Sequence, residues 1–296
     1  MRIKKLLVLL LIFMGISCFL GQNYLGNVLE NYIISNIDQI ALENEHILTV
    51  GKGKQFSEIQ KAVDYADDGY VIIVYPGEYN EAVDATNKTL SIIGVDKESC
   101  ILKHPNGDYH TPPLEIGSGK LVNMTVYAIS EEKKENAVAK SYAIHIDYDI
   151  SKQNTLYVKN VNIINDDYQG IGIGLRDHSV IEFHECNFIV HDDYNAFYCH
   201  DDPINANAVK QKLIVENCFF ENNGNASTIL LQSQEEEASD ILCKWRNNVV
   251  NNKSSDNLID IYLWKAKEIE NAGWLGMSFW KNSVFSKNNN IEALNY

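Results

Sequence analysis

The feature that most constrains the fold is a repeat of five similar apolar segments in the carboxyl-terminal half of the chain. The segments read TLYVKNVNII, VIEFHECNFI, KLIVENCFF, ILCKWRNNVV and GMSFWKNSVF. They superimpose without gaps, so equivalent positions recur at intervals of 25, 32, 30 and 34 residues. Three positions are apolar in every segment: Leu156, Ile181, Leu213, Cys243 and Met277 at the first; Val158, Phe183, Val215, Trp245 and Phe279 at the second; and Ile163, Phe188, Phe220, Val250 and Val284 at the third. Such a repeat predicts a solenoid, whose units stack to share one core.

The period of the apolar positions indicates strands rather than helices. Apolar and polar residues alternate along each segment, and a polar pair such as Glu216-Asn217 marks a bend between two strands. Each repeat also holds one further strand-like run: YAIHIDY, GIGIGL, AFYCH, STILLQ or LIDIYLW. Three short strands per repeat predict an all-β fold, a single-stranded right-handed parallel β-helix over residues 47–296. A β-sandwich or propeller is disfavoured because hairpin turns such as Asn-Gly are rare in the chain.

Helical spacing is clear only in the segment FSEIQKAVDYA near the start of this domain. Ile59, Ala62, Val63 and Ala66 fall on one helical face, and Ser57 is placed to cap the helix amino terminus. We expect this helix to cap the amino-terminal end of the core.

The amino terminus has the pattern of an export signal. Arg2, Lys4 and Lys5 precede an apolar run at residues 6–20, which is shorter than the about 20 residues that span a bilayer. We predict a signal peptide at residues 1–17, followed by a helical spacer at 18–46. The fate of Cys18 stays open between lipidation, simple cleavage and an uncleaved membrane anchor. The expected location is extracellular or at the cell surface, as in a bacterial secreted protein or lipoprotein.

The chain is acidic, with 25 Lys and Arg against 40 Asp and Glu. Removal of residues 1–17 leaves a net charge of −18, because three of the positive charges lie there. Nucleic acid is therefore not an expected partner, since its backbone requires clustered cations. An acidic polysaccharide is also repelled unless it is esterified or bridged by a divalent cation such as calcium.

Five cysteines follow Cys18, an odd number that cannot all pair within one chain. In the register of the repeats, Cys186 and Cys218 occupy the same bend of neighbouring coils. We expect them to be reduced core side chains, with a disulfide as the alternative.

The segment at residues 50–102 resembles the amino-terminal coils of pectin methylesterases. In that family a Phe-x-x-Ile-Gln-x-Ala helix is followed by a strand, a Pro-Gly-x-Tyr-x-Glu turn and a second strand that ends in glycine. The positions that match are Phe56, Ile59, Gln60, Ala62, Pro76, Gly77, Tyr79, Glu81 and Gly94. The resemblance implies the pectin lyase-like fold more strongly than it implies an activity.

The resemblance continues in GLRDHSVIEFHECNFIVHDD, where Leu175, Arg176, Cys186, Phe188 and Asp193 match the family pattern. It implies that Asp193 corresponds to the family's general acid. The family's nucleophilic aspartate and its arginine are not matched, because Ser227 or Thr228 and Met277 stand near those positions. Orthodox pectin methylesterase activity is therefore not expected.

The segment HDDYNAFYCHDDP is the densest group of ionisable and aromatic residues in the chain. Alternation places Phe197 and Cys199 in the core, with Tyr198 and His200 facing solvent. Neighbouring coils would add further polar residues to a groove on this side. The predicted catalytic residues are Asp193, His200 and Asp201, and the predicted substrate-binding residues are Arg176, His178, Tyr198, Asp202 and His145. The alternative is that the aspartates are solvated turn residues.

A groove with aromatic rings, carboxylates and amides suits a polysaccharide, because rings pack on sugars while polar groups bind hydroxyls. Two functions remain open: a carbohydrate-active hydrolase or lyase with an altered pectinesterase-like site, and a non-catalytic glycan-binding or adhesion protein. A purely structural envelope protein is a third. A divalent cation, calcium above all, could be held by His and Asp beside the groove. We expect a monomer.

Overall fold

The structure is a computed structural model of the chain. It describes residues 39, 41–42, 44–105, 111–129, 141–146, 154–175, 178–201, 209–233, 240–254, 259–262 and 284–285. The chain divides into two compact units, Met1–Ile47 and Leu48–Tyr296. The predicted signal peptide and most of the predicted spacer lie outside the described residues. Where the chain is described, no helix has the length and apolar character needed to cross a bilayer.

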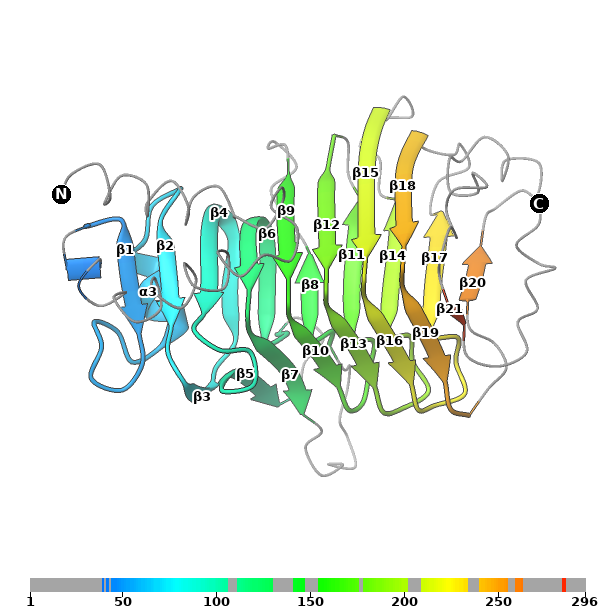
Figure 1. Cartoon of the computed structure of the whole chain (residues 1–296), viewed down its shortest axis with the longest axis horizontal. Coiled ribbons are helices and arrows are strands. Elements are labelled where there is room, and N and C mark those ends of the chain that lie inside the picture. The colour runs from blue at the N-terminus through cyan, green and yellow to red at the C-terminus, as the bar shows by residue number, and fades with distance from the viewer. Residues whose placement is uncertain are drawn as a thin grey trace, which may run out of the picture. The chain divides into compact units, whose positions relative to one another are not determined.

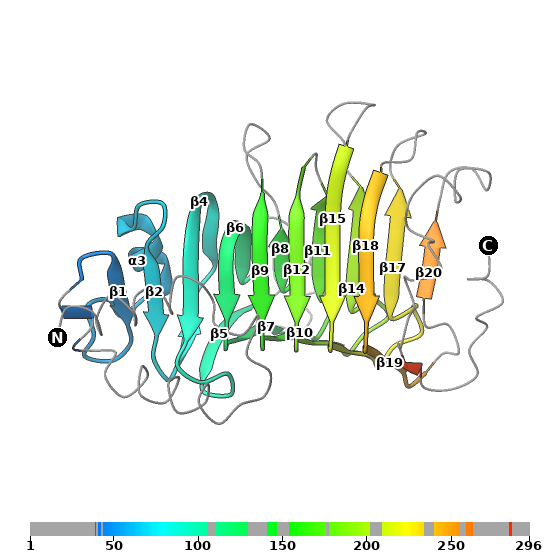
Figure 2. The ribbon, with the colours of Figure 1, turned by 45° about the horizontal axis from the view of Figure 1, so that its top comes forward.

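The second unit is a stack of coils whose parallel strands form two hydrogen-bonded sheets, and the larger sheet divides into two faces along most of the stack, so that three faces result (Figures 1 and 2). The first face consists of β8 (Ile144–Ile146), β11 (Ile171–Leu175), β14 (Phe197–Asp201), β17 (Ile229–Ser233) and β20 (Ile259–Tyr262). The second consists of β9 (Thr155–Lys159), β12 (Val180–His184), β15 (Val209–Glu216) and β18 (Asp240–Arg246). The third consists of β3 (Gly77–Asn80), β5 (Cys100–Pro105), β7 (Thr125–Ile129), β10 (Asn162–Asn165), β13 (Asn187–Val190), β16 (Phe219–Asn222), β19 (Val249–Asn252) and β21 (Val284–Phe285).

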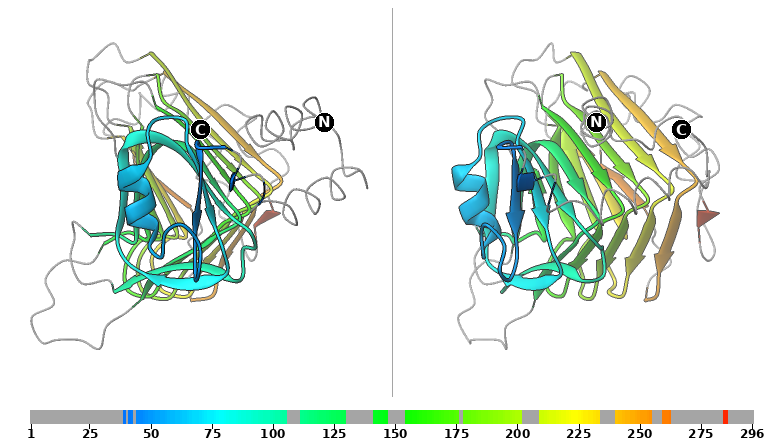
Figure 3. Two further views of the ribbon diagram at one scale, coloured as in Figure 1. Left: turned by 90° about the vertical axis from the view of Figure 1, so that its left-hand side faces the viewer. Right: turned by 60° about the vertical axis from the view of Figure 1, so that its left-hand side comes forward.

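The first two faces join at their amino-terminal end through two long strands, β4 (Val83–Gly94) and β6 (Leu114–Val122). One half of β6 pairs with β8 of the first face, and the other half pairs with β9 of the second. Strands β1 (Ile47–Val50) and β2 (Val71–Val74) extend the second face beyond β4. The pairings within each face are parallel, as between β10 and β13 or β11 and β14. The predicted parallel β-helix is thereby confirmed, and Figure 3 shows the coils viewed along the stack.

The apolar columns of the repeat become stacks of side chains inside the coils. Leu156, Ile181 and Leu213 are register partners on β9, β12 and β15, and all are fully buried. In the third face, the ring of Phe188 stacks on that of Phe220 with 4.6 Å between centroids and 2° between planes. One predicted partner is wrong: Val284 pairs with Val249, not with Val250. The pairing of β21 is therefore shifted by one residue from the gapless alignment.

Helix α3 (Ile59–Tyr65) lies at the amino-terminal end of the stack, and its buried face joins the core (Figure 3). The predicted cap by Ser57 is wrong. The capping position is Glu58, whose side chain makes no capping hydrogen bond. Instead the carboxylate of Glu81 accepts hydrogen bonds from the backbone N–H groups of Ile59 at 2.8 Å and Gln60 at 2.9 Å. A carboxylate stabilises a helix amino terminus by satisfying its free donors, so the Glu81 that matches the pectin methylesterase motif has a structural role here.

The bend between the second and third faces uses the same left-handed backbone conformation in successive coils. The residues at this bend are Asn123, Asn160, Glu185, Asn217 and Asn247, with φ between 52° and 57°. Asparagine tolerates this conformation better than most residues. Its side chains also connect coils, since Asn160 Nδ2 donates to Asn123 Oδ1 at 2.8 Å and Asn247 Nδ2 donates to Asn217 Oδ1 at 3.3 Å.

The cysteines next to this bend stack in the core as predicted. Cys186 and Cys218 are 0% and 2% exposed, and both are free thiols. Burial first, and then the side-chain hydrogen bond with the neighbouring Cys186 and the charge of Cys186, raise the pKa of the Cys218 thiol well above its usual value. A thiol held in its neutral form is inert towards oxidation, which agrees with a packing role for this pair.

Candidate functional site: an aromatic row on the first face

The outer side of the first face carries the predicted residues His145 and Tyr198. On β8, His145 lies between Ile144 and Ile146, which are each 1% exposed and point into the core. On β14, the core positions Phe197 and Cys199 are fully buried, so Tyr198 and His200 take the outer side. The alternation in the sequence predicts the same sides.

Between His145 and Tyr198 lies an outer position without a side chain. In the register of the first face, His145 pairs with Gly172 of β11, and Gly172 pairs with Tyr198. A Cβ atom at Gly172 would approach ring atoms of Tyr142 to 2.6 Å. The ring of Tyr142 therefore covers Gly172 and fills the place of its missing side chain.

The rings of His145, Tyr142 and Tyr198 form a nearly parallel set, which we call the aromatic row. The centroid of Tyr142 is 5.1 Å from that of His145, with 15° between the planes. It is 6.4 Å from that of Tyr198, with 10° between the planes. Two residues further along β14, the ring of His200 lies 5.5 Å from that of Tyr198, with 40° between the planes. Sequence reasoning missed Tyr142, although an outward glycine between two outward rings was a signal that some other side chain covers it.

The residues around the aromatic row hold it in place. Nδ1 of His145 lies 3.2 Å from a carboxylate oxygen of Glu115 on β6, which makes that nitrogen the donor. The backbone before Tyr142 is fixed because the amide of Asn165 donates to the carbonyl of Ser141 at 2.9 Å. The backbone after it is fixed by a 3.0 Å hydrogen bond from the N–H of Ala143 to the carbonyl of Gly170.

Two further tyrosines lie in the turns that lead into β11 and β14, and the first of them packs against the row. Tyr168 meets Tyr142 edge-on at 5.4 Å, and Tyr194 lies 4.7 Å from Tyr168. The buried asparagines at the ends of β10 and β16 fix these turns. Asn165 Oδ1 accepts from the N–H of Tyr168 at 3.0 Å, and Asn222 Nδ2 donates to the carbonyl of Tyr194 at 2.8 Å.

The structure describes the other predicted site residues only in part. Arg176 and Asp202 lie outside the described residues, and for Asp201 the structure describes the backbone, which pairs with Leu175 and Ser233. His178 lies between β11 and β12, exposed, with a left-handed φ of 61°.

Asp193 does not lie beside the other two predicted catalytic residues. It precedes β14 in the turn from the third face, whereas His200 and Asp201 end that strand. A strand rises about 3.3 Å per residue, so Phe197 and Asp201 alone are roughly 13 Å apart. Seven residues, part of them in an extended strand, lie between Asp193 and Asp201, and the catalytic roles of Asp193, His200 and Asp201 stay predictions.

The residue that faces Asp193 is Asn225 of the next coil. Its backbone N–H and its side-chain amide donate to the same oxygen of Asp193, at 2.6 Å and 3.0 Å. Ser227 and Thr228, which the sequence comparison placed here, are buried, at 3% and 0% exposure. The stacked cysteines contained the signal for Asn225, because Asp193 and Asn225 each follow a cysteine of the stack by seven residues.

A second histidine–carboxylate pair lies at the end of the third face. Nδ1 of His191 is 2.9 Å from Asp166, and the hydroxyl of Tyr127 donates to both oxygens of the same carboxylate at 2.9 and 3.0 Å. Burial first, and then the hydrogen bond and charge of Asp166, raise the pKa of Tyr127 to about 12. These contacts connect three successive coils and use both carboxylate oxygens.

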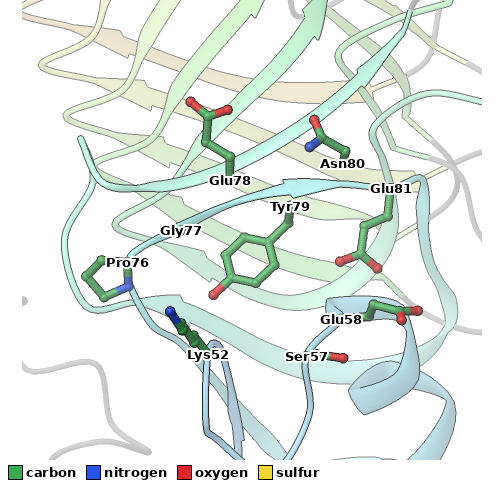
Figure 4. Close-up of a pocket in the computed structure, with 9 residues that line it drawn as sticks. All are labelled: Lys52, Ser57, Glu58, Pro76, Gly77, Glu78, Tyr79, Asn80 and Glu81. Carbon is green, nitrogen blue, oxygen red and sulfur yellow. The ribbon is translucent and has the colours of Figure 1, made fainter.

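A pocket with a volume of about 470 Å³ lies in the first coil, remote in sequence from the aromatic row (Figure 4). Its lining residues are Lys52, Ser57, Glu58, Pro76, Gly77, Glu78, Tyr79, Asn80 and Glu81. In Figure 4 the carboxylate of Glu81 points toward the start of the helix, where it caps α3. Burial, followed by the charges of Cys100 and Glu81, raises the pKa of Tyr79 to about 12. None of the predicted site residues lines this pocket.

The sequence leaves open a divalent cation held by His and Asp side chains beside the groove. Among the described residues there is no group of three or more His, Cys, Asp or Glu side chains arranged to hold a metal ion.

Comparison with known proteins gives likenesses of fold alone. No family model and no curated protein matches the chain. Among solved structures, a pectin methylesterase in complex with a hexasaccharide is 12% identical and has a TM-score of 0.43, over 82% of this chain and 91% of the other. Pectin methylesterase PemA from Erwinia chrysanthemi has the same identity and coverage and a TM-score of 0.45. The carrot pectin methylesterase is 12% identical, with a TM-score of 0.43 over 81% of this chain and 82% of its own. The parallel pairing of its strands makes the chain a parallel β-helix protein.

Proposed function

We propose that this protein binds a polysaccharide along the outer side of the first face, with the aromatic row as its principal contact. The observation that carries the proposal is that His145 and Tyr198 lie on the outer side of the first face, with their rings nearly parallel to the buried ring of Tyr142 between them. Tyrosine and histidine offer an apolar ring together with a polar tip, and sugars offer apolar C–H faces together with hydroxyls. The rows of parallel strands beneath repeat at about 4.8 Å, which provides a regular surface for a polymer.

The charge of the chain favours a neutral polymer over a polyanion. The net charge is −15, and Glu115 lies directly beside His145 at one end of the row. A uronate chain would meet repulsion there, whereas hydroxyls and acetamido groups would not.

Binding without hydrolysis agrees better with the positions of the carboxylates. Glycosidases use two carboxyl groups about 5 to 9.5 Å apart. Asp193 accepts a hydrogen bond from Asn225 and lies before the start of β14, whereas Asp201 is the last residue of that strand. We therefore propose a non-catalytic glycan-binding protein, exported through its amino-terminal signal.

The proposal is tested by titration calorimetry of the mature chain with three probes: cellohexaose, N-acetylchitohexaose and hexagalacturonate. Tyr198→Ala should weaken binding of a neutral hexasaccharide about tenfold, equivalent to about 1.4 kcal/mol. Tyr157→Ala is the matched control, because Tyr157 also stacks on a histidine, His184, at 5.1 Å, but on the second face. The proposal fails if no neutral hexasaccharide binds, or if the two variants weaken binding equally.

A further inference from the structure

The imidazole of His145 has a hydrogen-bond partner at one of its two nitrogens. Nδ1 lies 3.2 Å from a carboxylate oxygen of Glu115, the register partner of His145 on β6. No hydrogen bond from the residues that the structure describes reaches Nε2. The His145 side chain is 32% exposed, and its ring is nearly parallel to that of Tyr142. The aromatic row therefore contains a polar ring atom that the described part of the protein does not use.

The carboxylate of Glu115 determines which hydrogen bond this ring atom can make. An ionised carboxylate accepts hydrogen bonds and cannot donate them, and a neutral imidazole carries a proton on only one of its nitrogens. The proton therefore lies on Nδ1, which donates it to Glu115. Nε2 then holds a lone pair and is a hydrogen-bond acceptor. A ligand that contacts this nitrogen has to supply an O–H or N–H group.

The stacked histidine of the second face lacks this property. The ring of His184 packs on that of Tyr157 with 5.1 Å between centroids. Its Nε2 lies 3.2 Å from Glu182, and its Nδ1 lies 3.8 Å from Glu216. Both nitrogens of His184 thus face carboxylates, and neither remains as an acceptor for a ligand. The pair of His184 and Glu182 is therefore a matched control for His145.

An acceptor at the edge of a stacked ring suits a sugar whose hydroxyls are unsubstituted. A pyranose has apolar C–H groups on its faces and hydroxyl or acetamido groups around its edge, so a sugar packed on the row brings a donor near the edge of the imidazole. An O-methyl or O-acetyl group has no proton to donate. Nε2 of His145 therefore favours a polymer with free donors over one in which they are blocked.

We propose that Nε2 of His145 accepts a hydrogen bond from a hydroxyl or acetamido N–H group of the bound sugar, and that Glu115 is the positioning residue that keeps this nitrogen unprotonated. The inference rests on the proposed function and specifies its ligand as a polymer whose donors are not blocked by O-methyl or O-acetyl groups. Loss of one such hydrogen bond lowers the affinity about fivefold.

The position of the proton is tested without a ligand, by ¹H–¹⁵N correlation spectra of the imidazoles at about pH 8, where imidazoles are largely neutral. The ¹⁵N shift of each ring nitrogen depends on whether it carries the proton. The signals that disappear in His145→Phe identify His145. Its proton should lie on Nδ1 in the wild type, and this preference should be lost in Glu115→Leu. A wild-type His145 with its proton on Nε2 would overturn the inference.

Titration calorimetry at the same pH measures the effect of this nitrogen on binding. Glu115→Leu and His145→Phe should each bind cellohexaose or N-acetylchitohexaose, whichever the wild type prefers, about fivefold more weakly. His145→Phe keeps a ring in the row, so its loss reports the nitrogen rather than the stacking. The control variant Glu182→Leu removes the carboxylate beside His184 and should bind as the wild type does.

The O-methylated form of the preferred hexasaccharide isolates the donor of the ligand, because it keeps the sugar rings and lacks their hydroxyl protons. The wild type should prefer the unmethylated form, and His145→Phe should reduce that preference about fivefold. If His145→Phe leaves the preference unchanged, or if Glu115→Leu moves the proton to Nε2 without weakening binding, the inference is overturned while the proposed function stands. If Tyr198→Ala has no effect on binding, the proposed function itself is overturned.

Discussion

Asn225 donates two hydrogen bonds to a single carboxylate oxygen of Asp193, one from its backbone and one from its side chain. The pair joins two neighbouring coils in the turns that follow β13 and β16. A carboxylate at position 225 would face the carboxylate of Asp193 at hydrogen-bond distance.

Asn225→Asp should therefore destabilise the protein in a pH-dependent manner. Two like charges about 4 Å apart in water repel by about 1 kcal/mol. The repulsion raises the carboxyl pKa in the folded state above its unfolded value, so the destabilisation is complete at neutral pH and disappears as the pH falls below the unfolded pKa near 4. Urea unfolding of the wild type and of the variant at pH 7 and pH 3 measures this loss of unfolding free energy. The exchanged pair Asp193→Asn/Asn225→Asp is the control and should recover most of the loss; a loss that is the same at both pH values would contradict the explanation.

Glu185→Asn should stabilise the β-helix. Glu185 holds the left-handed bend conformation, with φ 57°, in a position where four other coils have asparagine. Asparagine adopts this conformation at lower cost and could bond to the amides of Asn160 and Asn217 in the adjacent coils, for a gain of about 1 kcal/mol. The lost partner is Lys159, 3.6 Å away and at the surface, where ion pairs contribute little. The comparison variant is Glu185→Gln, which removes only the charge. The denaturant midpoints of the two variants separate the effect of the left-handed backbone conformation from the effect of the lost ion pair. Equal midpoints would show that the bend conformation does not limit stability.

Core and surface aromatic residues should respond in opposite ways to truncation. Phe220 is fully buried between Phe188 and Trp245, so Phe220→Ala should cost about 3 to 5 kcal/mol of unfolding free energy. His200 is half-buried on the outer side, so His200→Ala should change stability by no more than about 0.5 kcal/mol and weaken hexasaccharide binding. Thermal unfolding measures the stability of the two variants, and titration calorimetry on the same preparations measures their hexasaccharide binding. A large loss of stability in His200→Ala with normal binding would make that residue structural.

Salt should alter the binding of acidic and neutral sugars differently. The net charge of −15 repels hexagalacturonate, and 0.1 M salt screens charges beyond about 10 Å. Hexagalacturonate should therefore bind more tightly as salt increases from 10 to about 300 mM, while cellohexaose is unaffected. Tighter binding of hexagalacturonate at low salt would show that cations such as Arg176 dominate the site instead.

Removal of the predicted signal peptide would change the mass of the protein by a known amount. If the signal at residues 1–17 is removed, the mature chain begins at Cys18. Intact-mass measurement of the protein purified from membranes and from medium should find this terminus, with a lipid on Cys18 in the membrane form. A chain that retains Met1 in both fractions would contradict export through cleavage.

The sequence predicts the coil well and the site only in part, for a physical reason. Side chains such as Phe183 and Phe188 follow a local alternation, and a parallel register repeats that alternation from coil to coil. The cap on α3 depends on Glu81, which lies 22 residues beyond Ile59, and short-range capping rules do not reach that far.

The site depends on such distant relationships even more strongly. The aromatic row needs Tyr142 and Gly172 to meet across adjacent strands, thirty residues apart. Asp193 and His200 are close in sequence, yet β14 extends between them and separates them in space.

Imidazole resonances in the NMR spectrum report where a glycan binds. The chain has eight histidines, of which His145 and His200 lie at the aromatic row and His184 lies on the second face against Tyr157. Addition of cellohexaose or N-acetylchitohexaose should shift the signals of His145 and His200 and leave that of His184 in place. A shift of His184 with no change at His145 and His200 would contradict binding at the aromatic row.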